Sequence, residues 1–178
     1  MIAVYILCCL FALVFALILS IHTPLSDEAF IITGLGATDR NGVPRVVIGR
    51  SVLVIPIIQR ISILDIGLRS SDFISDEFEL VDGATATITW SITYSPIPEL
   101  IPVAARNFAN LYPDDVCEIM VDLVYDILGS VITPLDAAGL GRGINDVRKR
   151  MENRIAEHSR ETGMKIELYM HKIKIVSR

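Results

Sequence analysis

The first apolar segment of the chain covers residues 2–21 and contains no charged residue. A helix of twenty residues rises 1.5 Å per residue and is about 30 Å long, which matches the core of a bilayer. A cleaved signal peptide is the alternative, but it usually has a basic start, a shorter apolar run and a small-residue cleavage site. No lysine or arginine precedes Arg40. We therefore expect residues 1–22 to form a retained transmembrane anchor.

Alternation of apolar and polar residues predicts strands in the next part of the chain. Residues 29–36 predict a strand ending on glycines, residues 39–42 a turn, and residues 44–48 the returning strand of a hairpin. Residues 85–94 alternate most regularly, with threonine or serine at every odd position, which is typical of a half-buried antiparallel strand. Its expected partner is the segment 73–80.

The segment 52–58 consists of seven consecutive apolar residues and includes a proline, Pro56, so its structure is not clear from the pattern alone. They are too few to cross a bilayer as a helix, and a single strand is not stable there. Pro56 cannot donate a backbone hydrogen bond to a sheet, so the segment is predicted to be an edge strand or to break at Pro56. In residues 59–71 both alternating faces are rather apolar, which predicts a strand covered on both sides.

Helical spacing replaces the strand pattern after residue 98. Pro113 and the two aspartates that follow it are typical of a helix start, and we expect Gly129 to end that helix. The predicted order is a helix at 99–111, a helix at 113–128, a loop or single turn at 133–143, a helix at 144–161 that Gly163 breaks, and a strand at 164–176. Strands, then helices, then one strand indicate an α+β fold, with an antiparallel sheet and helices packed on one side.

Composition and charge exclude some classes of function. Residues 23–178 have the size of one domain. The net charge of -5 gives no basic surface for nucleic acid. Cys8, Cys9 and Cys117 form neither a disulfide framework nor a metal-ligand spacing. Cys8 and Cys9 are open to acylation, although cysteines in an apolar helix usually act as small hydrophobic residues.

Candidate catalytic residues are few and scattered. No two histidines have metal-ligand spacing, and the glycines at 139–143 do not follow a strand as those of a phosphate loop do. An acidic stripe at helical spacing offers a cation site as the alternative to a solvated helix face. The stripe comprises Asp115, Glu118, Asp122 and Asp126. We expect no catalytic residue, no cofactor and no metal; an enzyme using Asp122 and Asp126 is the least favoured hypothesis.

The order of the segments resembles a known family. "EAFIITG" at 28–34, "VIPIIQRISILDIGL" at 54–68, "DILGSVITPLD" at 126–136 and "ETGMKIELYMHKIKI" at 161–175 resemble the SPFH or band 7 domain of stomatins, prohibitins and flotillins, and flotillin most closely. The resemblance covers about residues 24–177. It implies an α+β domain in a membrane-bound scaffold that forms large homo-oligomers or hetero-oligomers with other SPFH proteins. Such scaffolds define membrane microdomains, and some enclose a membrane protease.

The resemblance also implies a place for the apolar segment, near the lipid bilayer and beside the anchor. The residues predicted to be membrane-associated are Val52, Leu53, Val54, Ile55, Pro56, Ile57 and Ile58. The alternative is that they are ordinary sheet core.

Two further expectations follow from the resemblance. Flotillins continue into a long coiled coil, whereas this sequence stops at Arg178. The second hypothesis is therefore an adaptor that binds and regulates a larger SPFH assembly or a membrane protease. The few charges beside the anchor favour an outward-facing domain, but the resemblance implies the cytoplasmic face, which we expect.

Overall fold

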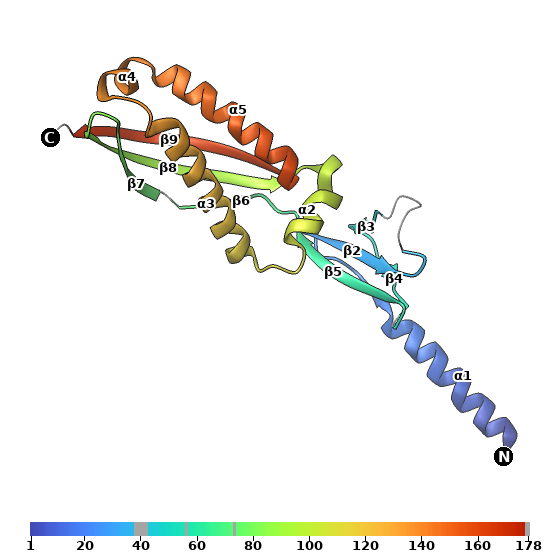
Figure 1. Ribbon diagram of the computed structural model, residues 1–178. Helices are drawn as coiled ribbons and strands as arrows, with labels where there is room; N and C mark the ends of the chain where they lie inside the picture. The colour runs from blue at the N-terminus through green and yellow to red at the C-terminus, as the bar shows by residue number, and fades with distance from the viewer. Residues whose placement is uncertain (38–42, 56, 73, 177–178) are drawn as a thin grey trace. The chain divides into compact units, whose positions relative to one another are not determined.

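The structure is a computed structural model that describes residues 1–37, 43–55, 57–72 and 74–176 (Figure 1). The chain divides into two compact units: the first comprises residues 1–66 and 108–110, and the second comprises residues 67–107 and 111–178. The elements are α1 (Ile2–Leu19), β1 (Ile21–His22), β2 (Glu28–Gly34), β3 (Arg45–Ile48), β4 (Val52–Leu53), β5 (Gln59–Asp65), β6 (Arg69–Ser70), β7 (Ile74–Glu79), β8 (Thr85–Pro96), η1 (Pro98–Leu100), α2 (Ile101–Phe108), α3 (Pro113–Ile132), α4 (Ala137–Arg142), α5 (Ile144–Thr162) and β9 (Met164–Val176). The predicted α+β class is confirmed.

The first unit is built around β2. This strand pairs antiparallel with β3 along one edge and with β5 along the other. The predicted hairpin of β2 and β3 is thus confirmed, while its predicted turn at 39–42 lies outside the described residues. An apolar cluster forms the core of the unit. Its members are Phe30, Ile32, Ala37, Val47, Val52 and Val54, with Ile61 packed against them.

The strand β5 is less covered than the sequence predicts. Leu64 is its one buried residue, and Ile63 is 45% exposed. The reason is topological, since β5 is at the edge of a three-stranded sheet and β2 is in the middle. Four of the seven residues of β2 are buried. The prediction of a strand covered on both sides is wrong for β5 and describes β2 better.

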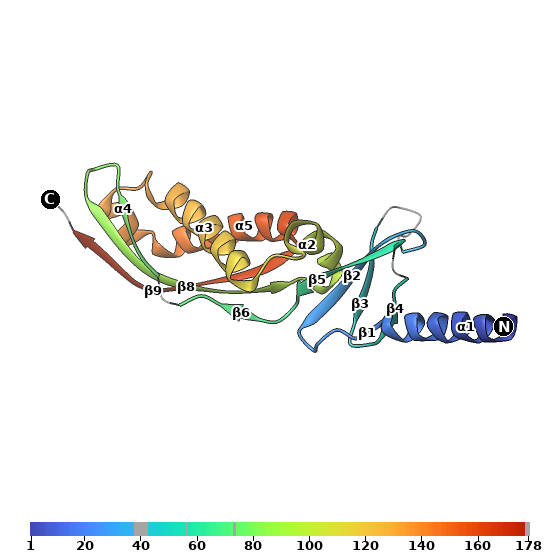
Figure 2. The same ribbon diagram turned by 90° about the horizontal axis from the view of Figure 1, so that it is seen from below.

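The second unit is built around β8. The strands β6 and β7 pair with one of its edges and β9 with the other, all antiparallel. Figures 1 and 2 show α3 and α5 on the same face of this sheet. The alternate residues of β8 from Ala86 to Tyr94 are buried, and the residues between them are half-buried. The predicted half-buried strand, its partner β7 and the final strand β9 are confirmed.

One detail of the helices differs from the prediction. Gly129 does not end α3, which continues to Ile132. Val131 and Ile132 are buried, and the burial of this further apolar turn offsets the roughly 1 kcal/mol that a glycine costs inside a helix. The segment 133–143, predicted to be a loop or a single turn, contains the short helix α4, whose first turn is capped by Asp136. The Asp136 Oδ1 accepts the Gly139 N–H at 2.7 Å.

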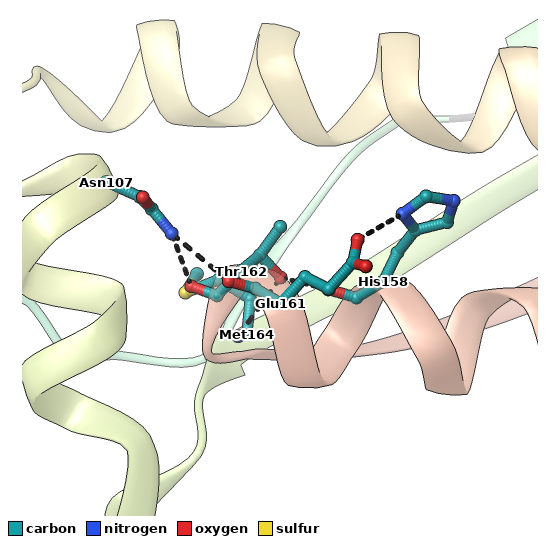
Figure 3. A network of polar contacts seen from close by, with 5 residues as sticks. All are labelled: Asn107, His158, Glu161, Thr162 and Met164. Atoms are coloured by element: carbon teal, nitrogen blue, oxygen red, sulfur yellow. Dashed lines mark hydrogen bonds and ion pairs between the residues drawn. The ribbon is translucent and has the colours of Figure 1, made fainter.

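The end of α5 is fixed by polar contacts with α2 (Figure 3). The Asn107 side-chain amide donates to the carbonyl oxygens of Glu161 and Thr162, at 3.4 and 3.3 Å. Gly163 follows with φ +76°, and a Cβ there would lie 2.6 Å from the Ala104 nitrogen. A side chain is therefore excluded at the position that ends α5, as predicted, and the chain turns directly into β9.

Candidate membrane-associated surface

The apolar segment 52–58 begins beside the end of α1. The short strand β4 pairs antiparallel with β1, which places Leu53 opposite Ile21. The Val54 N–H donates to the Ser20 carbonyl oxygen at 2.9 Å. Since α1 ends at Leu19, these contacts tie the start of the segment to the residues that directly follow the first helix.

The structure divides the predicted membrane-associated residues into two groups. Val52 and Val54 are 6% and 5% exposed and belong to the apolar core of the first unit. Leu53, Ile55, Ile57 and Ile58 are exposed, and Pro56 lies outside the described residues. The sheet-core alternative is therefore correct for two of the seven residues. Membrane contact stays a prediction for the four exposed ones.

Ile57 has an unusual conformation. Its side chain is fully exposed, and its backbone φ is +82°, a region that β-branched residues rarely adopt. Gln59 holds the turn in this form: its side-chain oxygen accepts the Ile55 N–H and its own N–H donates to the Ile55 carbonyl oxygen, both at 3.0 Å. The backbone strain at Ile57 is thus imposed by contacts around it.

A second turn lies directly against this one. The Leu35 N–H donates to the Ile58 carbonyl oxygen at 3.0 Å. Gly34 has φ +112°, and a Cβ there would lie 2.1 Å from the same oxygen, so only glycine permits this approach. Leu35, which is 76% exposed, is thereby brought next to Ile58.

These contacts connect one set of exposed apolar side chains, which we call the apolar rim. The rim comprises Ile21, Leu35, Leu53, Ile55, Ile57 and Ile58. Sequence reasoning missed Leu35, which the contact of two turns brings to the segment. It placed Ile21 in the predicted anchor, whereas strand pairing brings Ile21 beside Leu53. The available signal was a large apolar residue between two glycines, Gly34 and Gly36. A connected set of exposed apolar residues indicates an interaction surface.

The helix α1 has 18 residues, none of them charged. Described side chains such as Tyr5, Leu7 and Phe11 are 69%, 68% and 74% exposed. Within the part of the chain that the structure describes, no helix meets the combined length and apolarity required of a membrane span.

The structure does not assemble the titratable residues noted in the sequence. The acidic stripe lies exposed on α3, where Asp115 accepts the Tyr112 N–H at 3.4 Å. The His158 Nδ1 lies 3.2 Å from the Glu161 Oε2, and the His171 Nε2 lies 2.8 Å from the Ser91 Oγ. Among the described residues, no three histidine, cysteine or acidic side chains are placed to hold a metal ion.

Comparison with known families adds a further finding. A family model described as SPFH domain / Band 7 family matches residues 25–176. The match begins after β1 and includes every rim residue except Ile21. No curated protein matches the chain.

Proposed function

Because the chain belongs to the SPFH domain / Band 7 family, whose members are membrane-associated scaffolds, we propose that it is a membrane-anchored, non-enzymatic scaffold. In this proposal α1 is the anchor and the apolar rim contacts the bilayer beside it. The domain self-associates and organises a membrane microdomain or a membrane protein complex. The proposal places the domain on the cytoplasmic face, as the resemblance to flotillins implies.

The observation that carries the proposal is the exposed, strained Ile57 within the apolar rim. Full burial of one such side chain in an apolar medium is worth about 1.5–3 kcal/mol. Ile57 gains most of this on entering lipid, because its side chain is fully exposed. Val54, between the rim residues Leu53 and Ile55, donates a backbone hydrogen bond to Ser20, which directly follows α1. A membrane-inserted α1 would therefore bring the rim to the bilayer surface without further rearrangement.

Fluorescence quenching by brominated lipid tests the contact of the rim with the bilayer. The chain has one tryptophan, Trp90, which is fully buried. The variant Ile57→Trp, reconstituted as the full chain in vesicles with brominated acyl chains, adds a second emitter at the rim. We expect its added emission to be strongly quenched, since the new side chain enters the acyl region.

Val81→Trp is the matched control. Val81 is also a large exposed apolar residue, at 73%, but it lies in the second unit. Its added emission should be little quenched in the same vesicles. Equal quenching of the two variants, or none at position 57, would remove the rim from the membrane-contacting surface.

A further inference from the structure

The sheet of the second unit has a long open edge. The strand β9 has 13 residues and pairs with β8 along one side. Among the described residues no other strand pairs with β9, and β7 at the opposite edge likewise pairs with β8 alone. An open edge presents backbone donors and acceptors that a further strand can use. The sheet can therefore be extended at both edges.

The two open edges carry opposite charges on the same face. Glu77 and Lys174 lie on either side of Thr87, on the face of the sheet opposite to the buried Phe78 and Ile88. By the two-residue period of strands, Glu79 and Lys172 share that face. All four charged side chains are exposed, and within the described part of the chain none of them is in an ion pair.

The directions of the strands fit a head-to-tail contact. Both β7 and β9 run antiparallel to β8, so they run parallel to each other. A second copy that continues the sheet would thus place its β7 parallel to β9. Glutamates two residues apart on one edge would then lie beside lysines two residues apart on the other. Opposite charges on neighbouring strands stabilise such a pairing.

A two-fold contact would not have this complementarity. On the face opposite to the buried Ile88, the exposed charged residues of β9 include three lysines, Lys165, Lys172 and Lys174, but only one glutamate, Glu167. That glutamate is already bound by Lys165 at 2.7 Å, and the hydrogen bond from Lys165 holds the pKa of Glu167 below its ordinary value. Pairing β9 with a second β9 would bring lysines together. Pairing β7 with β7 would bring Glu77 and Glu79 together, and like charges destabilise the contact.

An open groove accompanies the β9 edge on the helical side of the sheet. One side of α5 lines a cavity with α3, through Arg150, Asn153, Arg154 and Glu157. The other side of α5 and β9 line a groove of about 510 Å³. Its apolar lining includes Met151, Ile155, Ile166, Leu168 and Met170. Its charged lining is mixed and comprises Arg148, Glu152, Arg160, Lys165 and Glu167.

A second copy at the β9 edge would bring a side chain to this groove. Tyr125 of α3 packs on Phe78 of β7, with ring centroids 5.4 Å apart, and it is still 42% exposed. It therefore lies on the helical side of β7, the strand that would join β9. An aromatic ring suits this groove because residues such as Met151, Ile155 and Met170 give it an apolar lining.

We infer that the β9 edge of one copy of this chain pairs in parallel with the β7 edge of the next copy, with Lys172 and Lys174 beside Glu77 and Glu79. This inference rests on the proposed scaffold function and supplies its subunit contact. The contact is head-to-tail, so it builds a closed ring or an open filament. The second units of neighbouring copies then share one continuous sheet.

Two charge-reversed chains test this contact. One carries Lys172→Glu and Lys174→Glu, and the other carries Glu77→Lys and Glu79→Lys. Each full-length chain is purified alone in detergent, and its mass is measured by light scattering. We expect each to lose the large species that the unchanged chain forms, because its two edges now carry the same charge.

Mixing the two chains is the decisive step. In an equimolar mixture every acidic edge can meet a basic edge, so the large species should return with the two chains alternating. Its return also shows that both chains are folded. Lys149→Glu with Arg150→Glu, which reverses two exposed charges on α5, is the control and should assemble as the unchanged chain does.

The possible outcomes of this experiment distinguish an error in the strand contact from an error in the proposed scaffold function. If the unchanged chain assembles and the reversed chains do so equally well, the strand contact is wrong and the scaffold proposal stands. Reversed chains that stay small after mixing would also overturn the contact. An unchanged chain that does not assemble at all would overturn both.

Discussion

Ile57 combines two features that are unfavourable in water. A left-handed backbone costs a residue with a side chain roughly 1–2 kcal/mol, and its φ is +82°. The side chain also gains nothing from the protein interior, since it is fully exposed. Gln59 and the close approach of Gly34 to Ile58 hold this turn in place. An isoleucine at this position is costly for the fold but well suited to a lipid contact.

The substitution Ile57→Gly should therefore stabilise the domain. Glycine removes the backbone strain but adds about 0.5–1 kcal/mol of unfolded-state entropy, so we expect a net gain of about 0.5–1 kcal/mol. Urea unfolding of the full chain, followed by hydrogen exchange of the backbone amides of β2 and β5 in the same unit, measures it. The control is Ile55→Gly, at a position that is 47% exposed and has no positive φ. It should be less stable than the unchanged chain; equal losses in both variants would show that Ile57 is not strained.

The rim shows how far the sequence alone could lead. The run 52–58 is uniformly apolar, so it predicts one surface. In the structure the start of this run alternates between two environments, as a strand does. Val52 and Val54 are buried in the core, while Leu53 is exposed. Leu35 and Ile21 join the rim through contacts between segments far apart in sequence. The two glycines beside Leu35 mark a turn, but they do not show which segment that turn lies against.

The elements themselves were more predictable, for a physical reason. The strands β8 and β9 and the helix α5 have regular periods and clear ends, such as Gly163, and the structure confirms them. The wrong predictions are those that depend on which other elements pack against a segment. Whether β5 is covered depends on its edge position, and whether Gly129 ends α3 depends on the burial of Val131 and Ile132.

Asp82 connects two elements of the second unit. It lies in the turn between β7 and β8, where its side chain accepts the Ala84 N–H at 3.1 Å and the Ala137 N–H at 2.9 Å. The Val81 N–H donates to the Leu135 carbonyl oxygen at 3.1 Å nearby. The turn is thereby tied to the start of α4. These backbone bonds, from Ala137 first, lower the pKa of Asp82 below its ordinary value of 3.8.

This lowered pKa predicts a specific pH dependence. A carboxylate whose pKa is lower in the folded state adds stability above its unfolded pKa and loses it as pH falls through the folded value. Asp82→Asn should therefore be less stable than the unchanged chain at pH 7. The difference should shrink below about pH 3.8, the ordinary value.

Urea midpoints between pH 3 and pH 7 measure this difference. Asp122→Asn, at an exposed carboxylate on α3, is the control and should leave the free energy of unfolding at pH 7 unchanged. A difference between the Asp82 variant and the unchanged chain that is constant with pH would show that the charge of Asp82 does not stabilise the turn.

At the scale of the whole molecule, the proposed function assigns membrane contact and self-assembly to different units. The first unit carries α1 and the apolar rim, which are the features suited to a bilayer. The second unit carries a sheet with one acidic and one basic open edge, which suits contact with further copies. Membership of the SPFH domain / Band 7 family agrees with both tasks.

The central claim is that this chain assembles with itself, and its mass in solution tests that most directly. The full chain, expressed alone and solubilised in mild detergent, is measured by light scattering with the detergent contribution subtracted. The account predicts a particle containing many copies of the 19.7 kDa chain. A particle of one or two copies would contradict it.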